Sequence, residues 1–270
     1  MTSASTNAGD WPQIADILAN HAGGRPDPST ELSGRKHTIF LAGGTELALD
    51  FETGDVLNWS LAGRPGVLGQ PYQAFWMRDG GYFVDFIDRT DQLLSFSLWL
   101  DLAKGTALLI EGSVADRSLE NENLLTRIER SGSQSVPKLS YRSGTIDVAG
   151  SHDYPRTSAL LGKYLRYVYS DTHVYDHYYQ NDKYYYWYCW KGPDAGIGEF
   201  DEAAYFDLGE ELYLVAWTEK LLPCLAVTVE DHRAMTSIGK IFGADSHSWQ
   251  TGNNTVGAKM TLVHAIPAGV

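Results

Sequence analysis

Aromatic side chains with polar tips gather in one stretch of the chain, "YVYSDTHVYDHYYQNDKYYYWYCW", residues 167–190. It holds nine tyrosines, two tryptophans and two histidines. Surface strands do not need so many rings, and an ordinary core favours Val, Ile and Leu. A pocket for a small organic molecule uses such rings for contact area and their hydroxyl or imidazole groups for hydrogen bonds. The stretch therefore predicts a small-molecule site.

Side chains alternate across a β-strand, so residues two apart share a face. If the odd positions of this stretch face inward, they line a pocket with hydroxyl, imidazole and carboxylate groups. A bulge or turn near Ser170 would break the alternation and move the later members. The odd positions from 167 to 177 are Tyr167, Tyr169, Asp171, His173, Tyr175 and His177.

Two tyrosines and one glutamate are the first candidates for catalysis. Tyr167 and Tyr169 could donate hydrogen bonds to a carboxylate, phenolate or enolate oxygen, or they could be large core residues with their hydroxyls at the rim. Glu219 ends the apolar run "LYLVAWTE". An apolar setting raises the pKa of a carboxyl and suits it to acid or base catalysis near neutral pH. The competing interpretation pairs Glu219 with Lys220.

The two histidines of the stretch are further catalytic candidates. His173 and His177 would lie about 13 Å apart on a straight strand, which is too far to chelate one metal ion. Either could act as a general base, and either could be a structural histidine with satisfied hydrogen bonds. A metal site would also need Asp171 or His232 nearby, and no known metal-ligand spacing is present. We expect no metal.

The remaining site candidates are pocket walls and a polar contact for a flat substrate. The glycine-rich "LAGGTE" lies between strands and no helix follows it, so it is not expected to cradle phosphate. Cys189 and Cys224 are expected to be core residues. We therefore predict a site without a cofactor. The expected substrate-binding residues are Tyr175, Tyr186, Trp187, Trp217 and Asp171.

The elements that must position these residues read mainly as strands. Short runs rich in aromatic and β-branched residues are separated by turn residues such as "ETGD", "RDGG", "QND" and "EDHR". This pattern predicts an all-β protein with antiparallel sheet closed as a barrel or sandwich. Helix signals are few, and they cover residues 10–21, 154–163 and the start of 118–139.

The two halves of the chain show a faint repeat. At an offset of 131 positions Tyr82 matches Tyr213, and Trp59 matches Trp190. Such matches predict a duplicated domain. The first copy has no tyrosine or histidine at the positions that match the odd set of 167–177. A single site is therefore expected in the second copy.

This organisation divides the chain into four parts. Residues 1–34 form an N-terminal segment with a short helix, and residues 35–115 form the first barrel. Residues 116–154 form a linker. Residues 155–270 form the second barrel, with the expected site.

The sequence resembles the MoaF-like family. The motifs are "YSDTHVYDHYYQNDKYYYWYCWKGP", "LYLVAWTEK" and "IGKIFG" in the second half, and "FLAGGTELALDFETGDVLNWSL" in the first. The resemblance covers about residues 35–265. It implies two tandem calycin (lipocalin-like) antiparallel β-barrels with few helices. The family name is linked to molybdenum cofactor biosynthesis, although these residues show no molybdopterin chemistry.

The second half is also similar to phenolic acid decarboxylases, which are cofactor-free calycin barrels. Their Y-x-Y pair matches Tyr167 and Tyr169, and their V-x-W-T-E strand matches residues 215–219. Their catalytic arginine lies between these motifs, where this chain reads "GPDAGIGEFDEAAYF" and has none. The resemblance implies a cofactor-free site in the barrel rather than decarboxylation of a hydroxycinnamate.

Charge and composition restrict the partners. The formal net charge is −13 and no basic block is present, which argues against nucleic acid and anionic membranes. No apolar run approaches the roughly 18 residues of a membrane span. With two cysteines and no secretory signal, we expect a cytoplasmic protein. The first copy would then be a scaffold, a lid or the surface of a homodimer.

Three functions remain open at this point. The first is a cofactor-independent lyase or isomerase that acts by acid/base catalysis on a small aromatic or unsaturated molecule in the second barrel. The second is a non-catalytic carrier or sensor of such a molecule. The third, which only the family name implies, is a role in molybdenum cofactor metabolism.

Overall fold

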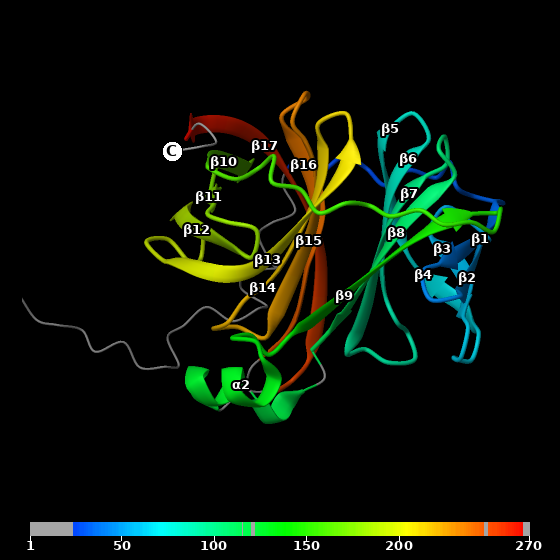
Figure 1. Ribbon diagram of the computed structural model, residues 1–270, viewed down its shortest axis with the longest axis horizontal. Helices are drawn as coiled ribbons and strands as arrows, with labels where there is room; N and C mark the ends of the chain where they lie inside the picture. Colours follow the sequence, from blue (N-terminus) through cyan, green and yellow to red (C-terminus); the bar gives the residue numbers. More distant parts are fainter. Residues whose placement is uncertain (1–23, 115, 120–121, 246–247, 267–270) are drawn as a thin grey trace, which may run out of the picture.

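The computed structural model describes residues 24–114, 116–119, 122–245 and 248–266. Two antiparallel β-barrels lie side by side (Figure 1). Strands β1–β9 build the first barrel and strands β10–β17 the second. The prediction of an all-β protein with two tandem barrels is therefore confirmed. Within the described ranges no helix has the length and apolar character to span a membrane.

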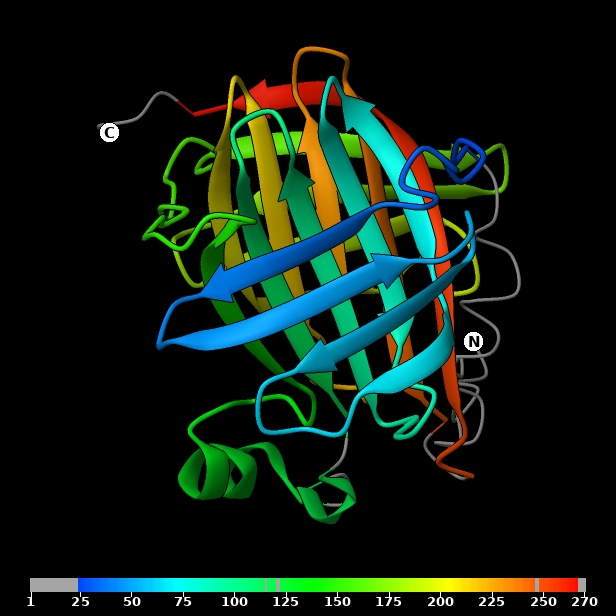
Figure 2. The same ribbon diagram turned by 90° about the vertical axis from the view of Figure 1, so that its right-hand side faces the viewer.

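The first barrel is a nine-stranded sheet in the order β4-β3-β2-β1-β9-β8-β7-β6-β5. In Figure 2 its strands β1–β3 cross in front of β6–β8, with the second barrel behind them. Its strands are β1 (Lys36–Leu41), β2 (Thr45–Phe51), β3 (Val56–Leu61), β4 (Val67–Pro71), β5 (Gln73–Arg78), β6 (Gly81–Ile87), β7 (Leu94–Asp101), β8 (Thr106–Ser113) and β9 (Lys138–Ile146).

The second barrel is closed by eight strands, each paired with the next along the chain, and β17 pairs back with β10. Closure leaves no free sheet edge. The strands are β10 (Lys163–Ser170), β11 (His173–Tyr179), β12 (Tyr184–Lys191), β13 (Gly198–Gly209), β14 (Leu212–Thr218), β15 (Cys224–Asp231), β16 (Thr236–Ala244) and β17 (Thr251–Ala265).

The two barrels have equivalent strand pairing. The pair Ile39–Leu47 across β1 and β2 corresponds to Tyr167–Tyr175 across β10 and β11, 128 positions later. The offset is 131 between β4–β6 and β13–β14, and 130 between β7–β8 and β15–β16. Most paired positions in one barrel therefore have an equivalent in the other, as expected for a duplicated unit.

The predicted single offset of 131 holds only for the middle strands. Tyr82 and Tyr213 are equivalent, because β6 and β14 share this offset. Trp59 corresponds to Trp187 and not to Trp190, because β3 and β12 are 128 positions apart. Loops of different length shift the offset along the chain, which an ungapped comparison cannot follow.

One strand of the second barrel is split in the first. At the offset of 131, β4 and β5 together occupy the place of the continuous strand β13. Pro71 ends β4, and proline has no N–H for a ladder hydrogen bond. Gln70 bridges the opening, since its side-chain amide donates to the carbonyl of Ile87 at 2.7 Å. The first barrel is thus nearly closed rather than closed.

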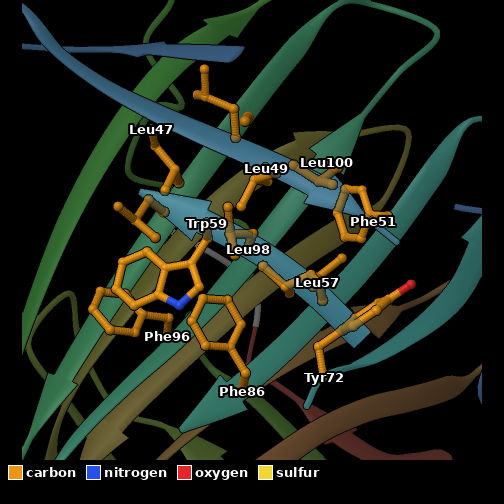
Figure 3. Packing of buried hydrophobic residues seen from close by; sticks show 14 of the residues in the cluster. Leu47, Leu49, Phe51, Leu57, Trp59, Tyr72, Phe86, Phe96, Leu98 and Leu100 are labelled. Atoms are coloured by element: carbon orange, nitrogen blue, oxygen red, sulfur yellow. The ribbon is translucent and has the colours of Figure 1, made fainter. Parts of the chain in front are cut away.

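The first barrel is filled by a hydrophobic core. Trp59 lies 5.3 Å from Phe86 and 4.8 Å from Phe96 between ring centroids, and leucines surround the three rings (Figure 3). Burial of a large apolar side chain contributes about 1.5–3 kcal/mol, so this packing stabilises the first barrel.

A second core lies between the barrels. The outer faces of β5–β8 and of β14–β16 pack against each other through side chains such as Phe83 and Leu214. A buried ion pair lies within this apolar contact: the Nζ of Lys240 lies 2.7 Å from Asp85, and both side chains are 1% exposed. Ser97 and Asn253 also donate hydrogen bonds to Asp85, which stabilises the buried carboxylate.

Two predictions about segments of the chain need correction, and a third concerns residues outside the described ranges. Residues 154–163 form turns and a β-bridge from Arg156 to Phe206 rather than a helix, because their backbone groups bond to β13. The predicted linker of residues 116–154 includes β9, which pairs with β1 and β8. It also includes the helices η2 (Arg117–Leu119) and α2 (Leu124–Ser131). The helix predicted for residues 10–21 lies outside the described residues.

Candidate functional site

The interior of the second barrel is polar where that of the first is apolar. Strand alternation turns the side chains of β10–β12 inward in the same way as those of β1–β3. The interior residues are Tyr167, Tyr169, Tyr175, His177, Tyr179, Tyr185 and Trp187. Their equivalents in the first barrel are, in the same order, Ile39, Leu41, Leu47, Leu49, Phe51, Leu57 and Trp59.

A small cavity lies among these side chains. Its free volume is about 40 Å³, room for roughly three water molecules. It combines a wall of aromatic rings with two carboxyl groups and one imidazole. Its lining residues are Tyr169, Tyr175, His177, Tyr185, Trp187, Asp194, Trp217, Glu219 and Ile241.

Larger hollows of about 340, 400 and 480 Å³ lie elsewhere on the molecule. Size alone would favour them over the small cavity. In the small cavity, however, five Tyr and Trp side chains surround His177, Asp194 and Glu219, and such a combination of aromatic rings and enclosed titratable groups is typical of sites that perform chemistry. We therefore place the candidate site in the second barrel.

Glu219 lies in an environment that favours the protonated form of its carboxyl group. Burial and the charge of Asp201 raise the pKa of the Glu219 carboxyl well above its usual range. Burial and the charge of Glu199 likewise raise the pKa of Asp201 to about 8. Lys220 does not pair with Glu219, because its Nζ lies 3.4 Å from Glu199. Glu219 is therefore surrounded not only by apolar side chains, as expected, but also by a group of neighbouring acids.

His177 is an unprotonated imidazole at neutral pH. Burial lowers its pKa to about 4, although the charge of Glu230 opposes the shift. Its ring stacks on Tyr167 with centroids 4.1 Å apart and meets Trp217 edge-on at 5.8 Å. Within the described part of the chain, His177 Nδ1 and Trp217 Nε1 are buried without a hydrogen-bond partner. Both groups border the cavity and could bind a water or ligand atom.

A second polar cluster lies deeper in the same barrel and was not predicted. The fully buried carboxylate of Glu230 accepts hydrogen bonds from the hydroxyls of Tyr167 and Tyr179, each at 2.9 Å, and contacts His232 Nε2 at 3.1 Å. Burial raises the pKa of Glu230, but the contact with His232 and the hydrogen bond from the Tyr167 hydroxyl have a larger, opposite effect, so the net shift is downward. Because Tyr167 serves Glu230, only Tyr169 of the predicted tyrosine pair lines the cavity.

Alternation could have revealed Glu230. In "CLAVTVED" the positions of Ala226, Thr228 and Glu230 share one face, whereas Val227 and Val229 face the other barrel. Alternation could also have revealed Tyr185, because it is two residues from the predicted wall residue Trp187 and so shares its face of the strand. Asp194, which accepts a hydrogen bond from the Tyr175 hydroxyl at 3.0 Å, belongs to the β12–β13 loop and has no periodic signal.

Besides Tyr167, three predicted site residues lie outside the cavity. Asp171 is exposed in the β10–β11 turn, where a bulge near Ser170 interrupts the alternation. Tyr186 lies on the opposite face of β12 from Trp187, with its ring 5.0 Å from Phe200. Neither residue lines the cavity.

His173 is buried at the start of β11 but does not line the cavity. Its Nδ1 lies 2.9 Å from the hydroxyl of Thr172 and 3.1 Å from that of Ser170. Burial lowers its pKa. These contacts favour the structural alternative for this histidine.

Comparison with known proteins shows the family of this chain. The family model described as MoaF N-terminal domain matches residues 9–116, and the one described as MoaF C-terminal domain matches residues 154–266. A protein named "Protein MoaF" from Klebsiella aerogenes is 30% identical over 230 residues, which cover 85% of each chain. The chain belongs to the MoaF family.

Among solved structures, a crystal structure from Burkholderia vietnamiensis described as a "putative beta-lactamase" aligns over its whole length and 40% of this chain. The identity is 21% and the TM-score 0.33. That likeness is too distant to bear on the site of this MoaF family member.

Proposed function

We propose that the second barrel catalyses a cofactor-independent lyase or isomerase reaction by acid/base chemistry on a small unsaturated molecule. The proposal rests on one comparison between the two barrels. The interior residues of the first barrel indicate which residue types the shared fold itself requires. Leu49 and Leu100 serve the first barrel at the positions where the second has His177 and Glu230. Burying such polar groups costs free energy, and the fold does not need them.

The cavity is lined by a candidate general acid and a candidate general base, whose pKa values are shifted in opposite directions. Burial and neighbouring acids raise the pKa of the Glu219 carboxyl, whereas burial lowers the pKa of the His177 imidazole to about 4. Pairs of groups with pKa values pushed apart are typical of acid/base catalysis. In the proposed reaction His177 removes a proton from carbon or oxygen, and Glu219 donates one to the developing oxyanion.

The lining supports a neutral, flat substrate. Among the described lining residues none is Lys or Arg, whereas Asp194 and Glu219 are acids. An anionic ligand such as a phosphorylated pterin would find no cation there, so the cavity does not fit that group. Aromatic walls suit an enone, a phenol or a lactone.

Entry of such a molecule requires the cavity to widen. The loop at residues 192–197 carries Asp194 and includes Gly192 and Gly196, with φ values of 144° and 89°. Few non-glycine residues adopt such backbone angles. Rearrangement of this loop is the proposed route of entry.

Solvent exchange tests the proposal without knowledge of the product. The protein is incubated in D₂O with a panel of neutral enones, phenols and lactones, and proton NMR follows deuterium entry at carbon. We expect catalysed exchange for at least one compound. Glu219→Gln should slow it by about a hundredfold or more, since a general acid contributes that factor.

A matched control comes from the first barrel. Asp88 is the equivalent of Glu219 there, so Asp88→Asn changes the same kind of group outside the cavity and should leave exchange unchanged. Wild-type exchange in Glu219→Gln would refute the catalytic assignment. Tight binding of a panel compound without any exchange would favour the carrier function instead.

A further inference from the structure

A groove between the barrels has the features of a second binding site. We define the inter-barrel groove as the hollow of about 480 Å³ where β17 faces the open end of β4 and the start of β5. Figure 2 shows this region at the edge where the start of the described chain, β5 and β17 lie together. Contacts between domains are common places for small-molecule sites.

Two glycines bring an arginine into this groove. A Cβ on Gly257 of β17 would lie 2.5 Å from the Cα of Arg25, and one on Gly24 would lie 2.6 Å from the carbonyl oxygen of Gly257. Only glycines at these positions allow such a close approach of the two chains. The guanidinium of Arg25 then lies 5.9 Å from the ring centroid of Phe75. This arrangement fixes Arg25 against the groove wall.

Two polar atoms in the groove have unused hydrogen-bonding capacity. Arg25 Nη1 and Asn253 Oδ1 are buried without a hydrogen-bond partner in the described part of the chain. The other polar atom of the Asn253 amide, Nδ2, donates to Asp85 at 2.6 Å, which fixes the direction of Oδ1. A buried group without a partner costs about 1–3 kcal/mol. The groove therefore presents one cationic donor and one acceptor.

The charge of the groove differs from that of the whole chain. The net charge of the protein is −13, yet the groove has Arg25 and Arg89 against the exposed Asp55. Asp85 also borders the groove, but Lys240 neutralises it at 2.7 Å. The local balance is therefore positive. Guanidinium groups bind carboxylate and phosphate oxygens well.

We propose that the inter-barrel groove binds a small organic anion that carries a hydroxyl or amino group beside its carboxylate or phosphate. The anionic oxygens bind Arg25, and the neighbouring hydroxyl or amino group donates to Asn253 Oδ1. This site does not depend on the chemistry proposed for the second barrel, since the two are lined by different residues.

Thermal unfolding of the full chain tests the proposal with defined probes. Glycerate, serine and glycerol 3-phosphate carry both groups, whereas propionate and glycerol carry one each. We expect the first three to raise the Tm by about 3 °C at ten times their Kd. The two single-group probes should have a clearly smaller effect. The difference between glycerate and glycerol 3-phosphate then separates a carboxylate site from a phosphate site.

Substitutions assign the effect to the groove. Arg25→Gln should weaken binding at least tenfold, measured as the Tm rise over the free variant, and Arg25→Lys should recover part of the loss. The control is Arg64→Gln, because Arg64 also lies over a phenylalanine ring, at 5.6 Å from Phe96, but is paired with Glu111 outside the groove. An equal Tm rise in Arg25→Gln and wild type would overturn the proposal. So would the absence of any rise with all three probes at 20 mM, roughly the limit of weak specific binding.

Discussion

Replacement of His177 by phenylalanine should make the stability of the protein less dependent on pH. The imidazole is buried among rings, and burial lowers its pKa from an ordinary 6.5 to about 4. Above pH 6.5 the ring is neutral in both the folded and the unfolded protein and contributes no pH dependence. Below pH 6.5 the unfolded chain binds a proton that the folded protein excludes, so the free energy of unfolding falls as the pH falls.

The size of this effect follows from the same pKa. Each pH unit between 6.5 and 4 lowers the free energy of unfolding by about 1.4 kcal/mol, so the loss is about 2 kcal/mol at pH 5 and about 3 kcal/mol at pH 4. Phenylalanine keeps the stacking on Tyr167 at 4.1 Å and removes the proton site. The free energy of unfolding of the variant minus that of the wild type should therefore be about 2 kcal/mol larger at pH 5 than at pH 7.

Urea unfolding at pH 7, 6, 5 and 4.5, followed by tryptophan fluorescence, measures this difference. His177→Leu provides the second variant, because Leu49 occupies the equivalent position in the first barrel. Leucine leaves space unfilled, so its curve should lie lower but have the same pH slope as that of phenylalanine. A difference from wild type that stays constant within 0.5 kcal/mol, about the precision of such measurements, would mean that the folded protein accepts the proton.

Two further predictions concern buried charges. Lys240→Met should lower the free energy of unfolding by about 3–5 kcal/mol, because it leaves Asp85 buried without its cation, and the double variant with Asp85→Asn should recover much of this loss. Urea unfolding at pH 7 measures both, and a loss below about 1 kcal/mol in the single variant would contradict a buried ion pair. Asp201 has a pKa raised to about 8 by burial and the charge of Glu199, so its stabilising contribution is complete below pH 3.8 and is lost as the pH rises through 8. The free energy of unfolding of Asp201→Asn, relative to that of the wild type, should thus rise by up to about 1.4 kcal/mol per pH unit between pH 5 and 8. Parallel curves of stability against pH for the two proteins would contradict the raised pKa.

Strand alternation predicted much of the fold and part of the candidate site. It placed Tyr169, Tyr175 and His177 on one face, and the structure brings these three to one cavity. It failed at Asp171, because a bulge and a turn interrupt the alternation there. Tyr186 was assigned to the pocket together with its neighbour Trp187, although adjacent strand residues face opposite sides.

Closure of the barrel was beyond the reach of sequence patterns. Tyr167 and Glu230 are 63 positions apart, and their hydrogen bond depends on which strands face each other across the interior. The pKa values of Glu219 and Asp201 depend on the same closure, because acids from β13, the β12–β13 loop and the end of β14 come together only in the folded barrel. The sequence indicated which residue types were present but not which would meet.

The place of β9 has a consequence for how this protein can be divided. The N-terminal family match ends at residue 116, whereas β9 (138–146) lies between β1 and β8 in the first sheet. A fragment cut at the family boundary would lack an interior strand and would expose both its neighbours as unpaired edges, which favour aggregation. It would also uncover the apolar face shared with the second barrel. The limits of the N-terminal family match therefore differ from the limits of the first barrel, which includes β9.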